Sequence, residues 1–310
     1  MGKAPSLLVE LPPSLGESVM ASGALVKLIS GLRPREVTLM GREPILELLL
    51  PLVPGARPLP YRKEGRWKKL FQTTRQFDIG VSFRRSLYSK LFLGKSCRKT
   101  YIFPKNIPGH LVEQYNIFIG RIAGGKEILP PQLSFTPHSY PRPTIGIYPG
   151  GGGGEAGRWY PDRFAQVANR LGKEFDIVIF GEVGEEKIAR EVEKNLTISN
   201  YQNLTGKLSL PQLSQMIGGL SLFLTNDSGA MHIASAYQVP IVAIFGPTDW
   251  RKNSPYSSNY KIVRVPLRCS PCHKGKCPLK NHQCMEEITP EIVIETIFQL
   301  LEEEKEGGGF

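Results

Sequence analysis

The fold follows from residues 222–250, which read LFLTNDSGAMHIASAYQVPIVAIFGPTDW. An apolar run at residues 222–224 meets the polar turn of residues 226–229, a helical pattern begins at Ala230, and a second apolar run covers residues 241–245. This order predicts a strand, a tight turn, a helix and a second strand. Such a strand–helix–strand unit belongs to a parallel α/β sheet.

The polar turn contains two helix-capping side chains, Asp227 and Ser228, followed by Gly229. Several backbone N–H groups at the helix start then point outward, and such a position binds anions, phosphates above all. His232 lies one turn into the helix on the side that faces the cap, and Thr248 follows the next strand at the same edge, where ligands collect in open α/β sheets. The alternative is an ordinary unit in which Asp227 and Ser228 only cap the helix.

Length and charge narrow the class of protein. A chain of 310 residues with 41% hydrophobic residues can bury a sizeable core, and its length favours two domains. Residues 1–140 hold 21 Lys and Arg against 9 Asp and Glu, whereas residues 141–310 hold 18 against 19. The basic half suggests an acidic partner, either an anionic membrane surface, a phosphorylated substrate or nucleic acid. Nucleic acid is the weakest of these because no recognisable binding motif is present, so we expect no nucleic-acid partner.

The first half alternates strands and helices. A buried strand at residues 7–11 runs through a proline corner into a helix at about residues 19–29, which places Glu17 at the carboxyl edge of the sheet. Acidic residues are also common in a first helical turn simply because they interact favourably with the helix dipole. The remaining expected strands are 36–40, 79–83 and 100–103, and the expected helices are 44–50, 67–74 and 110–123.

The second half repeats this pattern after a proline-rich segment, residues 129–143, which we interpret as a linker. A strand at residues 144–148 leads into Pro149 and the glycine run that begins with Gly150 and Gly151. Glycines between a strand and a helix let the backbone approach a diphosphate closely, although they are equally compatible with a flexible loop. The next strand, residues 176–180, precedes Glu185, at a position where a carboxylate often holds a nucleotide ribose.

Two domains therefore follow from the sequence, residues 1–135 and 144–310, joined by a linker at about residues 130–143. Both are expected to be Rossmann-like, doubly wound α/β domains that face a cleft, with one substrate on each wall. The last helix, from residue 290 to about 303, either belongs to the second domain or returns to the first, and residues 302–309 are expected to fray. The start of the sequence lacks a signal-peptide profile, so we expect a cytosolic protein.

A cysteine cluster precedes the last helix. Cys269, Cys272, Cys277 and Cys284 fall within sixteen residues. In a cytosolic protein such a cluster favours a structural metal ion, zinc above all, or free thiols over disulfides, although the outer spacing is not that of a standard zinc ribbon. No base is evidently paired with a single cysteine, which argues against a catalytic thiol.

The motifs together resemble those of a known enzyme family. TNDSGAMHIA at residues 225–234 and VAIFGPTD at residues 242–249 are similar to the signature of the bacterial ADP-heptose:lipopolysaccharide heptosyltransferases, glycosyltransferase family 9. Similarity to the heptosyltransferase II branch extends over nearly the whole chain and is carried by PSLGESVMA (13–21), GRWYPDRFA (157–165), CSPC (269–272) and CPL (277–279).

The resemblance implies a GT-B fold, with the nucleotide sugar on the second domain and the acceptor on the first. It implies an inverting transfer of heptose from ADP-L-glycero-D-manno-heptose to a heptosyl-Kdo-lipid A acceptor, a phosphorylated lipid at the cytoplasmic face of the inner membrane, without a cofactor. Glu17 is then the general base, and Ser14 and Gly16 beside it are assigned to the acceptor. The residues assigned to the donor are Gly150, Gly151, Arg158, Glu185, Leu208, Asp227, Ser228, Gly229, His232 and Thr248.

Two departures from the family pattern qualify these roles. The family usually has aspartate where this chain has Glu17. It also normally has a lysine that contacts the donor phosphate at the position of Gly157, and the neighbouring Arg158 either takes over this contact or only forms an ion pair on the surface. Two alternatives to heptose transfer therefore stay open: a GT-B enzyme with another nucleotide-sugar substrate, and a non-catalytic nucleotide-binding protein.

Overall fold

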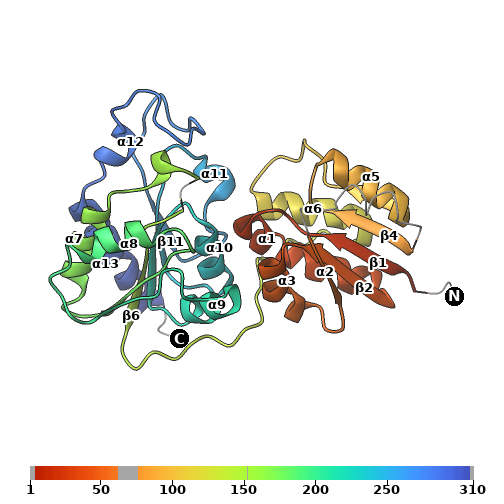
Figure 1. Cartoon of the computed structure of the whole chain (residues 1–310), viewed down its shortest axis with the longest axis horizontal. Coiled ribbons are helices and arrows are strands. Elements are labelled where there is room, and N and C mark those ends of the chain that lie inside the picture. The colour runs from red at the N-terminus through yellow and green to blue at the C-terminus, as the bar shows by residue number, and fades with distance from the viewer. Residues whose placement is uncertain (1–3, 62–75, 152, 308–310) are drawn as a thin grey trace. The chain divides into compact units, whose positions relative to one another are not determined.

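The computed structural model describes residues 4–61, 76–151 and 153–307. The chain divides into two compact units, Met1–Phe135 and Thr136–Phe310, and each has its own sheet. In Figure 1 the first unit runs from red to yellow and the second from yellow-green to blue. The expected helix at residues 67–74 lies outside the described residues.

The first unit contains a parallel sheet with the strand order β3-β2-β1-β4-β5. Its strands are β1 (Ser6–Glu10), β2 (Glu36–Gly41), β3 (Arg57–Pro60), β4 (Phe77–Ser82) and β5 (Cys97–Ile102). Its helices are α1 (Leu15–Met20), α2 (Ser22–Leu32), α3 (Glu43–Leu49), the short 3-10 helix η1 (Leu50–Leu52), α5 (Leu87–Ser96) and α6 (Leu111–Ala123). All five residues of β1 are buried, as expected for a central strand that has helices on both of its faces.

The segment Leu15–Leu32 is apolar and long enough to cross a membrane when judged by length and composition alone. More than half of it, 56%, is buried inside the structure, and it is divided at Ala21 into α1 and α2. Helix α2 packs along α6, so this apolar surface contributes to the core of the first unit.

The second unit contains a parallel sheet with the order β11-β10-β9-β6-β7-β8. Its strands are β6 (Thr144–Tyr148), β7 (Asp176–Ile179), β8 (Tyr201–Asn203), β9 (Leu222–Asn226), β10 (Ile241–Ile244) and β11 (Tyr260–Val263). Its helices are η2 (Glu155–Gly157), α7 (Pro161–Leu171), α8 (Glu186–Glu193), α9 (Leu210–Gly218), α10 (Gly229–Ala236), α11 (Trp250–Asn253), α12 (Gln283–Glu286) and α13 (Pro290–Gly307).

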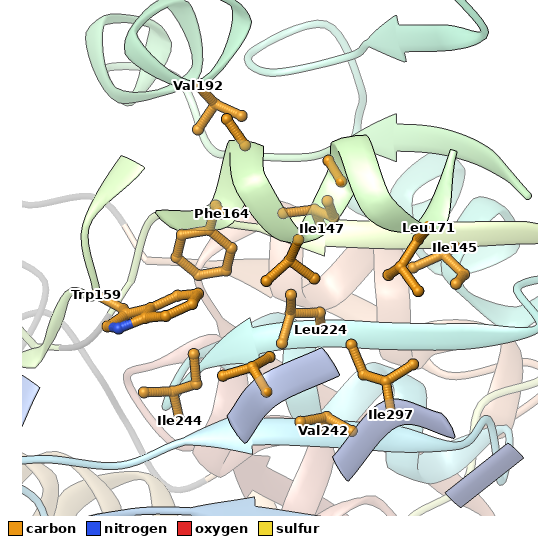
Figure 2. Close-up of a cluster of buried hydrophobic side chains, with 14 of the residues drawn as sticks. Ile145, Ile147, Trp159, Phe164, Leu171, Val192, Leu224, Val242, Ile244 and Ile297 are labelled. Atoms are coloured by element: carbon orange, nitrogen blue, oxygen red, sulfur yellow. The ribbon is translucent and has the colours of Figure 1, made fainter. Parts of the chain in front are cut away.

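Side chains on both faces of the central strands build the core of the second unit. Leu222 and Leu224 of β9 join the cluster under α7 and α13, which Figure 2 shows with Trp159 and Phe164 at one end. Phe223 between them is also fully buried and contacts the rings of Tyr148 and Phe180. Successive side chains of a strand point to opposite faces of the sheet, and both sets are buried because helices cover both faces. Helices α7, α8 and α13 pack as one group, and α9 and α10 pack as another (Figure 1).

The structure adds detail to the expectations for the linker and for the last helix. The proline-rich segment is anchored at both ends: Gln132 N–H donates to Ser22 Oγ in the first unit, and His138 N–H donates to the Gln215 carbonyl in the second. The last helix belongs to the second unit, where Ile297 lies in the core. It continues to residue 307, beyond the expected end at about residue 303.

The elements that were not predicted from the sequence include β3, α5, β8 and β11, besides the one-turn helices η1, η2, α11 and α12. The strands β3, β8 and β11 have only three or four residues each and lie at or beside a sheet edge, so their burial pattern is weak. Helix α5 exposes Leu87 and Leu91 while it buries Tyr88 and Phe92, and this irregular distribution conceals the helical period.

Candidate active site

The carboxyl edge of the second sheet brings two loops together. Strand β6 pairs with β9, so the glycine loop after Tyr148 and the polar turn after Asn226 lie side by side. A Cβ atom built on Gly151 would lie 2.7 Å from the Cβ of Ser228, and Gly151 has φ +72°. Only glycine fits this close approach without strain, and the sequence-predicted phosphate loops are in contact.

Asn226 joins these loops through all of its side-chain groups. It is completely buried, and its Nδ2 donates to the carbonyls of Pro149 and Gly150, both at 2.9 Å. Its Oδ1 accepts from the backbone N–H of Trp159 at 3.0 Å. Sequence reasoning assigned no role to Asn226. The available signal was a polar amide at the end of an otherwise apolar strand, where a buried group needs partners.

Ser228, and not Asp227, caps helix α10. Ser228 Oγ accepts from Met231 N–H at 3.2 Å and exchanges a hydrogen bond with Thr225 Oγ1 at 2.9 Å. The expectation that Asp227 shares the capping role is therefore wrong, because the N-cap position falls one residue later. Gly229 is the first residue of the helix, so its N–H group has no carbonyl partner within the helix, and it belongs to the predicted anion site.

The carboxyl group of Asp227 lies beside Thr248 and Asn253 instead. Burial raises its pKa to about 6, while the side chains of Thr248 and Asn253 act in the opposite direction. The structure thus brings Asp227 and Thr248, two predicted donor-site residues from successive strand ends, to the same place. His232 is 3% exposed in the first turns of α10.

Glu185 holds the glycine loop. Its Oε1 accepts from Gly151 N–H at 2.8 Å, its Oε2 accepts from Glu182 N–H at 2.9 Å, and a Cβ on Gly150 would lie only 2.3 Å from its carboxylate. Burial and then the charges of Glu185 and Glu182 raise the pKa of Tyr148 far above its ordinary value. The carboxylate therefore has a structural partner on the loop, in addition to the ribose role that the sequence predicts.

Arg158 is also fixed to this loop. Its Nε donates to the Gly151 carbonyl at 3.1 Å, and its Nη2 lies 3.9 Å from Glu185 Oε1. The side chain is 33% exposed, so part of the guanidinium still faces solvent. This arrangement leaves a positive charge at the position next to Gly157. Leu208 is half-buried just before α9, in the connection from β8.

Glu17 lies in the first unit, in the first turn of α1. Ser14 caps this helix, and its hydroxyl donates to Glu17 Oε2 at 2.9 Å. Gly16 is buried in the same turn. Burial, and then the charge of Glu17, raise the pKa of Tyr115 well above its ordinary value, so the Glu17 carboxylate acts on this phenol. The structure brings together the predicted base and both predicted acceptor residues.

The segment of the cysteine cluster contacts the end of the glycine loop after β6 and the loop after β10. Gly275 O accepts from Ala156 N–H at 3.0 Å, and Ser270 Oγ donates to Gly246 O at 2.6 Å. His282 pairs with Tyr160 OH at 3.0 Å and with Ala156 O at 2.8 Å. These contacts place the cluster behind both loops, a role that the sequence did not indicate.

The four cysteines of this segment line one small cavity of about 30 Å³ together with His282, and all are free thiols. Burial raises the pKa of Cys284, and the other three thiols add to this effect. Within the described part of the chain, no three His, Cys, Asp or Glu side chains are grouped so that they could hold a metal ion. The arrangement therefore does not by itself support the predicted zinc site.

Comparison with known proteins places this site in a family. The model of glycosyltransferase family 9 (heptosyltransferase) matches residues 126–283. The chain is 34% identical to lipooligosaccharide heptosyltransferase 2 of Campylobacter jejuni, over 95% of this chain and 98% of that protein. It superposes on the structure of Escherichia coli ADP-heptose lps heptosyltransferase II with a TM-score of 0.79 at 23% identity, covering 97% and 99% of the two chains.

A second solved structure, E. coli heptosyltransferase WaaC with ADP-2-deoxy-2-fluoro heptose, gives a TM-score of 0.69 at 15% identity, covering 95% and 99%. These structural likenesses establish the GT-B fold, two Rossmann-like α/β domains. The length and extent of the sequence match establish more than the fold. The chain belongs to glycosyltransferase family 9, the heptosyltransferases, and is a glycosyltransferase.

Proposed function

We propose that this protein transfers heptose from ADP-L-glycero-D-manno-heptose to a heptosyl-Kdo-lipid A acceptor in the synthesis of the lipopolysaccharide core. The observation that carries the proposal is the pair of loops joined by Asn226, because two backbone turns in contact at a sheet edge suit the diphosphate of a nucleotide sugar. The names of the relatives, heptosyltransferase 2 and ADP-heptose lps heptosyltransferase II, support the choice of sugar.

The donor diphosphate is assigned to the loops at Gly150, Gly151 and Gly229. Gly150 and Gly229 supply backbone N–H groups, Gly151, whose N–H donates to Glu185, permits the close approach of the two turns, and Ser228 orders the turn. As the bond to the anomeric carbon breaks, negative charge grows on the leaving ADP. Fixed donors and the Arg158 guanidinium stabilise that charge most when it is fully developed, which lowers the barrier. His232 and Thr248 complete this end of the site, and Glu185 and Leu208 are assigned to the ribose and adenine.

Glu17 is assigned as the general base. A carboxylate that removes the proton of an acceptor hydroxyl permits attack on the face opposite the leaving group, which inverts the anomeric configuration. The Ser14 hydroxyl, at 2.9 Å, holds one carboxylate oxygen and leaves the other for the acceptor. The longer side chain of glutamate, compared with the family aspartate, moves this oxygen outward by one methylene.

The proposed reaction uses no metal ion, and a structural zinc ion at the cysteine cluster remains a separate prediction. The acceptor is a phosphorylated lipid, so the basic first unit suits a protein that works in the cytoplasm, peripherally on the inner membrane.

A donor panel tests the proposal. ADP-heptose should be consumed with the heptosylated acceptor and yield ADP, while the Glu17→Ala variant should bind ADP normally and turn over far more slowly. Binding of ADP without turnover by the wild-type protein would contradict the proposed reaction and favour a non-catalytic nucleotide-binding role.

One observation favours a second candidate, a GT-B enzyme with another nucleotide-sugar substrate. Gly157 stands where the family has its phosphate-contacting lysine, and Arg158 is partly committed to Gly151 and Glu185. Tighter binding of UDP than of ADP in the same panel would identify this case.

A further inference from the structure

Glu10 is a buried carboxylate that the proposed reaction does not use. It ends β1, the central strand of the first sheet, and its side chain is completely inaccessible to solvent. Ser82 Oγ donates to Glu10 Oε2 at 2.6 Å, and Tyr61 OH donates to Glu10 Oε1 at 2.8 Å. Two neutral donors do not compensate a buried negative charge, so a cation is needed next to it.

Arg84 supplies that cation. Its Nη1 lies 3.8 Å from Glu10 Oε1, and its guanidinium carbon lies 5.0 Å from the centre of the Tyr61 ring. The Ser82 hydroxyl also accepts from Arg84 N–H at 3.0 Å and thus fixes the backbone. The side chain is 22% exposed, and the single long contact with Glu10 leaves most of the five N–H donors of the guanidinium for another acceptor.

Arg85, the next residue, packs on a different aromatic ring. Its guanidinium carbon lies 4.4 Å from the centre of the Phe103 ring, which in turn contacts the ring of Tyr115. The charge of Arg85 lowers the pKa of Tyr115 while burial and the charge of Glu17 raise it. Arg85 and the predicted base therefore act on one phenol, which places the end of β4 in the surroundings of Glu17.

The sequence around this pair contains no acidic residue to neutralise it. Residues 79–112 include seven Lys and Arg and no Asp or Glu, and Arg85 makes no ion pair within the described part of the chain. The Arg84 guanidinium is already held by Glu10 and the Tyr61 ring, so it can bind an oxyanion with little further loss of side-chain freedom.

We propose that Arg84 is the anchor of an oxyanion-binding subsite in the first unit, that Glu10 is its positioning residue, and that Arg85 adds positive charge beside it. The ligand is a phosphate or carboxylate group, carried either by the acceptor saccharide or by an anionic lipid headgroup. The inference rests on the proposed function in assigning the acceptor to the first unit.

The test measures binding in the absence of a donor. The probes are an O-deacylated, phosphorylated heptosyl-Kdo saccharide and, separately, vesicles of phosphatidylglycerol with phosphatidylcholine vesicles as the neutral reference. Arg84→Ala should weaken saccharide binding by about 10- to 100-fold, as expected for the loss of a charged hydrogen-bonding partner. Arg84→Lys should recover only part of it because the planar fork is lost.

Arg98→Ala is the matched control, because Arg98 is a basic residue of the same unit that is 76% exposed and lies beside Asp78. It should leave binding unchanged. A loss confined to the anionic vesicles in Arg84→Ala would assign the subsite to a lipid headgroup, and a loss confined to the saccharide would assign it to the acceptor. Unchanged binding of both probes would overturn the subsite.

The role of Glu10 has its own readout. Glu10→Gln keeps the shape of the side chain and removes its charge, and its one amide oxygen can still accept from either Ser82 or Tyr61, so it should weaken binding by a smaller factor than Arg84→Ala. Combined with Arg84→Ala it should have no further effect, whereas two additive losses would contradict the positioning role.

Failure of the subsite and failure of the proposed reaction can be told apart. ADP affinity should be unaffected in all variants, because ADP is assigned to the second unit, and circular dichroism with thermal unfolding checks that the first unit is folded. A wild-type protein that binds the saccharide but does not consume ADP-heptose would contradict the reaction and leave the subsite standing. A wild-type protein that binds neither saccharide nor anionic vesicles would overturn the subsite.

Discussion

The side-chain amide of Asn226 donates to the Gly150 carbonyl at 2.9 Å and so ties the end of β9 to the glycine loop after β6. The two residues are 76 positions apart in the chain and meet because their strands are neighbours in the sheet. The shape of the predicted diphosphate site therefore depends on one buried amide.

Asn226→Asp should reduce both stability and ADP affinity. A carboxylate cannot donate to the carbonyls of Pro149 and Gly150, so two buried acceptors lose their partner and the free energy of unfolding should fall by roughly 2 to 4 kcal/mol. Denaturant unfolding and ADP titration measure the two effects.

Asn116→Asp is the control for this substitution. Asn116 is also completely buried, and its Nδ2 donates to two carbonyls, those of Val112 and Leu129, but it lies in the first unit. It should lose comparable stability and keep its ADP affinity at temperatures where it is folded. Equal ADP affinities in the two variants would show that Asn226 does not shape the site.

Glu17→Gln should reduce kcat by about 10² to 10⁴ while ADP affinity is unchanged, because an amide cannot accept the acceptor proton. Steady-state kinetics with saturating acceptor measure this. Glu43→Gln, another acidic residue in a first helical turn, should have little effect. A fall of less than tenfold in Glu17→Gln would remove Glu17 from the role of base.

Gly150→Ala should weaken ADP binding by displacing Glu185. The new Cβ would lie 2.3 Å from the carboxylate that holds the N–H groups of Gly151 and Glu182. Gly94→Ala is the matched control, since nothing lies within 4 Å of a Cβ there and α5 should gain up to about 1 kcal/mol of helix propensity. Calorimetric titration with ADP should separate the two variants, and normal affinity in Gly150→Ala would count against the loop as a ligand site.

The raised pKa of Asp227 predicts a pH dependence of stability. The folded protein holds this proton up to a pH of about 6, whereas an unfolded chain releases it near the ordinary pKa of an aspartate, 3.8. The folded state thus binds more protons in this window, and the contribution of Asp227 to stability falls as the pH rises from about 4 to 6 and stays low above it.

Asp227→Asn should remove that slope and raise the free energy of unfolding at pH 7 by no more than about 3 kcal/mol. Unfolding curves for both proteins between pH 4 and pH 8 provide the comparison. Parallel curves over the whole range would show that the Asp227 carboxyl titrates alike in both states.

The cysteine cluster predicts a bound structural zinc ion, which a measurement of the zinc content can test. If the structural zinc ion is present, protein purified without chelator should contain zinc in proportion to protein, and Cys272→Ser should lose most of it. Cys97→Ser should retain it, because Cys97 is buried at the start of β5, away from the cluster. Wild-type protein that contains no zinc would contradict the zinc site and show that the four cysteines are free thiols.

Much of the fold could be predicted from local patterns. Apolar runs bounded by glycine and proline located β1, β6, β9 and β10, because strands that are buried on both faces are continuously apolar. The short edge strands β3, β8 and β11 could not be found in this way, since half-exposed strands of three or four residues carry too little pattern. The capping role was assigned too broadly because both Asp and Ser are good caps, and only the backbone at Ser228 decides between them.

The sequence by itself determined where the predicted site residues lie in the fold: the turn at residues 226–229, the glycine run and Glu17 all follow strand ends, and parallel strands bring such ends to one edge of their own sheet. Only the tertiary structure decided which side chains build it. The bonds from Asn226 to Gly150, from Gly151 to Glu185, and from Ser82 to Glu10 join residues 76, 34 and 72 positions apart. These partners meet through strand order and register, which arise from packing the whole sheet and are not written in any local pattern.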